Sequence, residues 1–161
     1  MTTIAAAGTP GISRFTTQQL LRTARLFATD PELGALIDRT APQRHWHLLD
    51  STPHLQIWLL AWPPGTSTGW HDHAVSSGAF LVVDGILSEH TWARGHVHER
   101  LLTEDEGRTF GSRHIHHVSN PGAELALSVH LYSPALTHLT RYALRDGRLD
   151  ETGVERAGED W

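Results

Sequence analysis

The sequence contains no cysteine and no lysine, and all thirteen of its basic residues are arginine. Without cysteine the chain can form no disulfide and can offer no thiolate to a metal ion. Its longest apolar run, residues 55–64, is too short and too interrupted to cross a bilayer. The first residues also lack the basic and apolar regions of a signal peptide. We therefore expect a cytoplasmic protein that does not enter a membrane.

The thirteen basic residues are outnumbered by eighteen acidic ones, and the formal net charge is −5. No basic stripe of the kind that binds nucleic acid is present in the sequence. A length of 161 residues suits one domain that buries a core. We expect a monomer or homodimer whose partners are small molecules rather than nucleic acid.

The N-terminal part of the chain has helical signals. Residues 1–11 are small, polar and rich in glycine and proline, which predicts disorder. Thr16 and Gln19 have the spacing of a capping box, and apolar residues follow at helical spacing: Leu20, Leu21, Ala24 and Phe27. Asp30-Pro31 predicts the N-cap and first residue of a second, short helix.

From residue 44 onward, short apolar segments are separated by glycine, proline, aspartate and serine. The clearest segments are residues 55–62, 79–83, 86–92, 114–118, 125–132 and 138–144. Such regularly spaced strands predict an all-β sandwich or barrel. Asp84-Gly85 and Asp146-Gly147 are predicted hairpin turns. We expect one domain, with a tail and two short helices in residues 1–43 and a β-barrel in residues 44–161.

Thirteen histidines are present, and three of them have the spacing of metal ligands. His71 and His73 are two residues apart, so in a strand both imidazoles point to the same face. His116, which precedes Asn120 by four positions, can supply a third imidazole. Three protein ligands with open positions are typical of a catalytic metal site, and imidazole suits iron, copper, zinc and nickel.

These motifs resemble those of the cupins. His71 and His73, followed by Gly78 and Gly85, resemble the first cupin motif, and His116 with Asn120 resembles the end of the second. The resemblance implies a double-stranded β-barrel of the jelly-roll type over residues 44–161. Common cupins have a glutamate ligand where this chain has Gly78. The departure implies three neutral histidine ligands and one more vacant position on the metal.

Residues 71–92 and 114–134 are similar to the cysteine dioxygenase family of thiol dioxygenases. The family's G-x-L-x-E segment is present at residues 85–89, and its S-x-H-x-Y segment at residues 128–132. The resemblance implies that iron(II), written Fe(II), is the cofactor and that the metal ligands are His71, His73 and His116. It also implies a dioxygenase that converts a small thiol and dioxygen into a sulfinic acid.

The residues of the S-x-H-x-Y segment also indicate a chemical role independently of the family resemblance. Strand alternation places Ser128, His130 and Tyr132 on one face. Ser128 can fix the tautomer of His130, which can in turn hold the Tyr132 hydroxyl in one direction. A phenol aimed at the metal can donate a hydrogen bond to dioxygen or to charge developing on sulfur. We interpret the three residues as a catalytic relay, with a set of buried, satisfied polar residues as the alternative.

The substrate is expected to carry a carboxylate, as cysteine and 3-mercaptopropionate do. Many family members bind this group with an arginine on an early strand, and that position falls at Trp46 here, or with a shift at Arg44 or His47. Other relatives use an arginine shortly after the tyrosine, and Arg141 has that placement. A planar guanidinium suits bidentate carboxylate binding. We predict Arg141 as the substrate-binding residue, with Arg113 as a lesser candidate.

Several alternatives remain open at this stage. His114 shares strand parity with His116 and could replace it as a ligand. Mammalian-type relatives crosslink a cysteine to the tyrosine, which is impossible in a chain without cysteine. Two other functions also fit a cupin: a non-catalytic protein that binds a small molecule, and a different cupin metalloenzyme.

Overall fold

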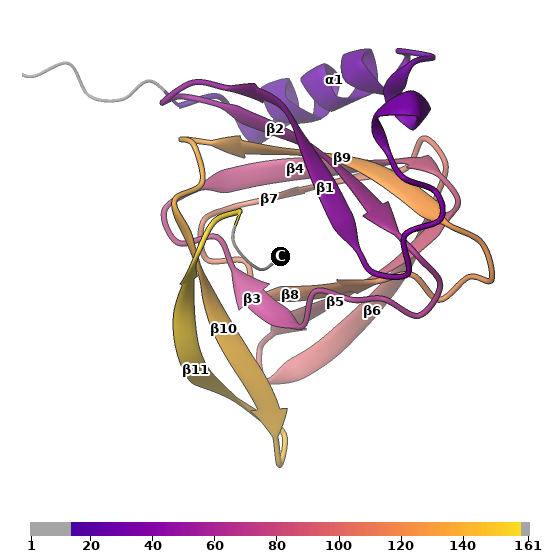
Figure 1. The fold of residues 1–161 in the computed structure, drawn as a ribbon. Coiled ribbons are helices and arrows are strands. Elements are labelled where there is room, and N and C mark those ends of the chain that lie inside the picture. Colours follow the sequence, from indigo (N-terminus) through magenta and orange to yellow (C-terminus); the bar gives the residue numbers. More distant parts are fainter. Residues whose placement is uncertain (1–13, 159–161) are drawn as a thin grey trace, which may run out of the picture.

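A computed structural model describes residues 14–158, and the predicted disorder of residues 1–11 lies outside the described residues. Within that range, two antiparallel sheets face each other, and a helix covers the outer side of one of them (Figure 1). The predicted all-β jelly-roll class is confirmed. No helix of this part of the chain combines the length and apolar character needed to cross a membrane.

The strand order in each sheet differs from the sequence order. The five-stranded sheet runs β1 (His45–Ser51), β2 (Gln56–Trp62), β9 (Ala126–Ser133), β4 (Ser77–Asp84) and β7 (Gly107–Phe110). The six-stranded sheet runs β11 (Arg148–Arg156), β10 (His138–Arg145), β3 (Trp70–Asp72), β8 (His116–Ser119), β5 (Ile86–Ala93) and β6 (His96–Thr103). The two short strands at the centre of the second sheet, β3 and β8, carry the histidine motifs.

Two short helices precede the barrel, as predicted. In α1 (Thr17–Ala28), the Gln19 N–H donates to Thr16 Oγ1 and the Thr16 N–H donates to Gln19 Oε1, so the capping box is confirmed. The second helix is a 3₁₀ turn, η1 (Leu33–Leu36). Its predicted start at Asp30-Pro31 is wrong, because the helix begins at Leu33 with Glu32 as its N-cap. The Asp30 carboxylate accepts the Glu32 N–H within the preceding turn.

The two Asp-Gly pairs have different structures. Asp146-Gly147 joins β10 to β11 with positive φ at both residues, which is the mirror-image turn of a two-residue hairpin. The hairpin predicted at Asp84-Gly85 is wrong, since β4 and β5 lie in different sheets. Gly85 has φ +80°, and a Cβ there would lie 2.9 Å from the Ala126 Cα. Glycine therefore allows the chain to pass close to β9 as it changes sheet.

The three central strands of the five-stranded sheet, β2, β9 and β4, are mostly buried on both faces. The inner face of the sheet packs in the barrel interior, with Trp58, Leu60, Trp62 and Phe80 in the core. Its outer face packs on the helices. Leu59 and Val129 of the sheet belong to the same apolar cluster as Leu20 and Ala24 of α1. All eight residues of β9 are buried. Strand alternation there directs Leu127, Val129 and Leu131 toward the helices and the polar residues between them toward the interior.

Candidate active site

The three predicted metal ligands lie together inside the barrel. His71 is the middle residue of β3, His73 follows that strand, and His116 begins β8. His71 and His116 are direct partners in the pairing of the two strands. One nitrogen of each imidazole lies within 4.8 Å of the others, and all three residues are buried. The HxH spacing and the distant third histidine thus converge on one point, as the sequence predicted.

Hydrogen bonds fix the outward nitrogens of two of these rings. His71 Nδ1 donates to the Gly69 carbonyl at 3.1 Å, and His116 Nδ1 donates to Glu89 Oε1 at 2.8 Å. Each ring then keeps a lone pair on Nε2. Both nitrogens of His73 are buried without a hydrogen-bond partner among the described residues. Buried polar atoms are rarely left unsatisfied, so the His73 ring fits the role of a metal ligand.

Burial also keeps these rings neutral. It is the main cause that lowers the pKa of His71 and His73 well below the usual value, and neighbouring histidines lower it further. Burial likewise lowers the pKa of His116, although the Glu89 carboxylate works in the opposite direction. A metal ion binds the unprotonated ring, so the three residues present the donor set that a metal requires.

Glu89 anchors the ligand side of the site, and sequence reasoning noted it only as part of the G-x-L-x-E segment. Its buried Oε1 accepts from His114 Nε2 at 3.0 Å as well as from His116, and its Oε2 accepts from Arg108 Nε at 2.7 Å. Burial alone would raise the pKa of Glu89, but the hydrogen bonds from His114, His116 and Arg108 hold it well below its usual range. Such carboxylates orient a metal-binding histidine and increase its basicity.

His114 therefore has a role beside the ligands rather than among the three converging histidines. Glu89, His114 and His116 form a second group whose donor atoms lie within 4.8 Å of one another. In that group, however, the close contacts are the hydrogen bonds that join both histidines to Glu89. The arrangement is explained by hydrogen bonding without a second metal ion.

At Gly78, where the cupin resemblance implies a glutamate ligand in other members, the structure leaves no room for a side chain. A Cβ at this position would lie 2.4 Å from Phe110 Cζ and 2.8 Å from the Leu131 carbonyl oxygen. The Phe110 ring stacks on His73 with 4.7 Å between ring centres. An aromatic ring thus occupies the space into which a side chain at residue 78 would extend.

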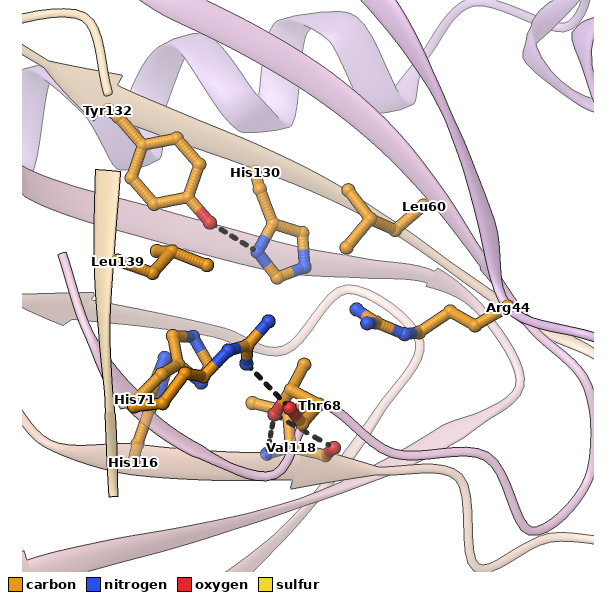
Figure 2. Close-up of a pocket in the computed structure, with 10 residues that line it drawn as sticks. Arg44, Leu60, Thr68, His71, His116, Val118, His130, Tyr132 and Leu139 are labelled. Carbon is orange, nitrogen blue, oxygen red and sulfur yellow. Dashed lines mark hydrogen bonds between the residues drawn. The ribbon is translucent and has the colours of Figure 1, made fainter. Parts of the chain in front are cut away.

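The predicted relay residues form a continuous row on the inner face of β9. Ser128 Oγ lies 2.8 Å from His130 Nε2. His130 Nδ1 lies 3.4 Å from the Tyr132 hydroxyl, and Figure 2 shows this second contact. Burial raises the pKa of Tyr132 well above its usual value, so its phenol keeps its proton. Sequence reasoning missed Trp62, whose Nε1–H donates to Ser128 Oγ at 2.8 Å.

A small cavity lies between the histidine group and the relay (Figure 2). Its lining comprises Arg44, Leu60, Thr68, His71, His116, Val118, His130, Tyr132, Leu139 and Arg141. The predicted carboxylate-binding residue, Arg141, is therefore at the cavity. Of the two shifted alternatives on the early strand, Arg44 also lines it, whereas His47 is exposed. Trp46 packs on the inner core and Arg113 is exposed. Neither side chain is therefore placed to bind a carboxylate in the cavity.

The two arginines are held differently. Arg141 donates from Nε to Glu155 Oε2 and from Nη1 to the Thr68 carbonyl, both at 2.7 Å. The Arg44 guanidinium lies over the Trp62 ring, 5.2 Å from its centre. Burial, together with the positive charge of Arg141, lowers the pKa of Arg44 to about 10, which still leaves it charged at neutral pH. Within residues 14–158, no carboxylate lies within salt-bridge distance of Arg44.

Solved structures share this fold at low sequence identity. A protein from Thermus thermophilus is 19% identical, with a TM-score of 0.57 over 65% of this chain and 96% of its own. A cupin superfamily protein from Desulfitobacterium hafniense is 16% identical, with a TM-score of 0.55 over 64% and 88%. A protein with a double-stranded β-helix domain from Klebsiella pneumoniae is 14% identical, with a TM-score of 0.56 over 78% and 97%. These similarities show the cupin fold.

Sequence comparison is more specific than the fold. The family described as cysteine dioxygenase type I matches residues 28–145, which is more than half of the chain. The matched range contains the three converging histidines, Glu89 and the row on β9. The chain belongs to the cysteine dioxygenase type I family.

Proposed function

We propose that this protein is an iron(II)-dependent dioxygenase that converts a small, carboxylate-bearing thiol of the cysteine or 3-mercaptopropionate type into its sulfinic acid. The observation that carries the proposal is that both halves of the site meet in one cavity. His71 and His116 of the metal group line it together with His130 and Tyr132 of the relay. A barrel that only bound a small molecule would need neither the neutral histidine group nor the aligned relay.

The reaction adds both atoms of dioxygen to sulfur, so that R–SH and O₂ give R–SO₂H. Sulfur is oxidised, dioxygen is reduced, the carbon–sulfur bond stays intact, and no further reductant is required. Iron(II) would be held by His71, His73 and His116 and would supply the redox chemistry of the reaction. These three side chains are neutral, so the site favours an anionic thiolate over a neutral thiol.

The protein's own groups position the reactants. The Tyr132 hydroxyl would donate a hydrogen bond to the negative charge that develops on the reacting oxygen or sulfur atoms. Leu60, Val118 and Leu139 line the cavity with apolar surface and limit the access of water. Holding the reactants in one geometry removes much of the entropic cost of the reaction.

Arg141 is our proposed carboxylate-binding residue, and Arg44 supports the same substrate class. Two guanidinium groups at one cavity favour an anionic substrate. Arg141 already pairs with Glu155, whereas no carboxylate of residues 14–158 lies within salt-bridge distance of Arg44, so a substrate anion would compensate the Arg44 charge. None of the described lining residues carries a carboxylate that could pair with a substrate ammonium group. The lining therefore favours a thiol acid without an amino group, of the 3-mercaptopropionate type, over cysteine.

Oxygen consumption by the iron-loaded protein tests the proposal. The thiols to compare are 3-mercaptopropionate, cysteine and cysteamine, with the sulfinic acid product identified by mass spectrometry. We expect the two thiol acids to outperform cysteamine, which has no carboxylate. Oxygen use without a sulfinic acid product would indicate a different cupin metalloenzyme, and no oxygen use with any thiol would indicate a binding protein.

A further inference from the structure

Trp62 extends the row on β9 by one more polar group. It ends β2, is fully buried, and donates from Nε1–H to Ser128 Oγ at 2.8 Å. The same serine oxygen contacts His130 Nε2, and His130 Nδ1 contacts the Tyr132 hydroxyl. Four side chains from two neighbouring strands thus form one chain of hydrogen bonds that ends at the cavity.

The donor-to-acceptor direction of these hydrogen bonds follows from which groups can donate and which can accept. An indole N–H donates and cannot accept, so Trp62 can stand only at the donating end. In the opposite direction His130 Nε2–H would donate to Ser128, and the serine hydrogen would need another acceptor. Ser128 is fully buried, and within residues 14–158 its hydroxyl contacts only Trp62 and His130. That direction would leave a buried hydroxyl hydrogen unsatisfied, which native structures avoid.

We propose that Trp62 is a positioning residue that fixes His130 as the tautomer with its proton on Nδ1. Ser128 then donates to His130 Nε2, and His130 Nδ1–H donates to the Tyr132 oxygen. In this arrangement the Tyr132 oxygen accepts a hydrogen bond from His130, so the Tyr132 hydroxyl hydrogen is not directed at His130. His130 therefore does not act as a base that removes the Tyr132 proton.

The surroundings of His130 are consistent with a single neutral tautomer. Burial lowers the pKa of His130 to about 3, with a smaller contribution from His116, so the ring carries one proton. The Phe80 ring stacks on His130 with 5.0 Å between ring centres and 9° between planes. Stacking holds the ring plane, so that its two nitrogens face Ser128 and Tyr132.

Nitrogen-15 NMR of histidine-labelled protein tests the tautomer directly. The full chain is measured with zinc(II), which is diamagnetic, and the His130 signals are assigned from their loss in His130→Gln. Long-range proton–nitrogen correlations distinguish the two neutral tautomers. We expect the proton on Nδ1, and a proton on Nε2 would overturn the proposal. Because no substrate is present, this result is independent of the proposed dioxygenase function.

The variant Trp62→Phe tests whether the indole is the cause. It removes the donor and leaves space for a water that can accept from Ser128, so both directions become possible. We expect a mixture of His130 tautomers, unchanged iron content and a kcat about 10-fold to 100-fold lower, as for other outer partners of a metal site. This activity prediction rests on the proposed function.

Trp58→Phe is the matched control, since Trp58 lies on the same strand and in the same core but its indole N–H donates to Gln56. It should keep the Nδ1 tautomer and the kcat of the wild type. An unchanged tautomer in Trp62→Phe would overturn the role of Trp62. A changed tautomer with normal kcat would leave the tautomer assignment standing and would instead contradict the proposed role of the relay in turnover.

Discussion

At the scale of single residues, two histidines that are close in the sequence have different contacts in the candidate site. His116 belongs to the converging group, whereas His114 donates to Glu89. We expect one iron per chain in the wild type, loss of iron in His116→Ala, and retention of iron in His114→Ala. Metal analysis of the purified variants checks this. Full iron content in His116→Ala together with loss in His114→Ala would show that the third ligand is His114 instead.

Tyr132 gives a second prediction at this scale. Tyr132→Phe keeps the ring in the core and removes only the hydroxyl. We expect normal iron content and a turnover about 10²–10³-fold lower, because one hydrogen-bond donor to developing charge is lost. Steady-state oxygen consumption and metal analysis measure the two quantities. If turnover is unchanged, Tyr132 is a packing residue and the relay has no catalytic role.

At the scale of elements, the β10–β11 hairpin presents Arg141 to the cavity. Glu155 on β11 holds the Arg141 guanidinium from behind, at 2.7 Å. We expect Arg141→Ala to raise KM for thiol acids, because binding in the ground state and in the transition state is lost alike. Looser orientation of the thiol should also reduce the amount of sulfinic acid formed per dioxygen consumed. Kinetics on 3-mercaptopropionate, with product quantified, measures both effects.

Arg44→Ala is the informative comparison for this prediction, because the two arginines reach the cavity from different elements. If Arg141→Ala has normal kinetics and Arg44→Ala has a raised KM, the carboxylate binds to Arg44. Normal kinetics in both variants would remove the carboxylate from substrate recognition.

The elements also show what could be predicted from the sequence. The histidine spacing, the alternation of β9 and the capping box of α1 are local patterns, and each one predicted its structure. Strand β6 was not predicted, because nearly all of its residues are exposed and its apolar alternation is weak. Asp84-Gly85 was misread, because the same two residues can close a hairpin or take the chain to another sheet.

The missed site residues share a cause. Trp62 ends β2 and Arg108 lies on β7, and each meets the site only through the pairing and packing of whole sheets. No local spacing connects them to the histidine motifs. Glu89 had a motif but no assigned role, since its three hydrogen bonds come from residues that are distant in the sequence.

At the scale of the whole molecule, the buried histidines link stability to pH. Burial lowers the pKa of His71, His73, His116 and His130 from the ordinary value of 6.5. Below about pH 6.5 the unfolded chain therefore binds protons that the native state does not, and the folded state loses stability as pH falls. Each such histidine contributes a slope of up to about 1.4 kcal/mol per pH unit.

We expect the free energy of unfolding of the metal-free protein to be lower at pH 5.5 than at pH 7.5. Urea unfolding at a series of pH values measures it. The variant His130→Gln should have a shallower slope, since one of the contributing groups is absent. A free energy that stays constant over this interval would mean that these histidines titrate normally in the folded protein.

The double burial of β9 has a consequence for the motions of the molecule. This strand is hydrogen-bonded to β2 on one side and β4 on the other, and both of its faces are covered. Its amide hydrogens can therefore reach deuterated solvent only when the five-stranded sheet itself opens. Hydrogen–deuterium exchange should be slowest in β9 and much faster in the exposed strands β6 and β11. The relay then lies on the most persistent part of the fold, and its geometry is maintained through every local fluctuation short of global unfolding.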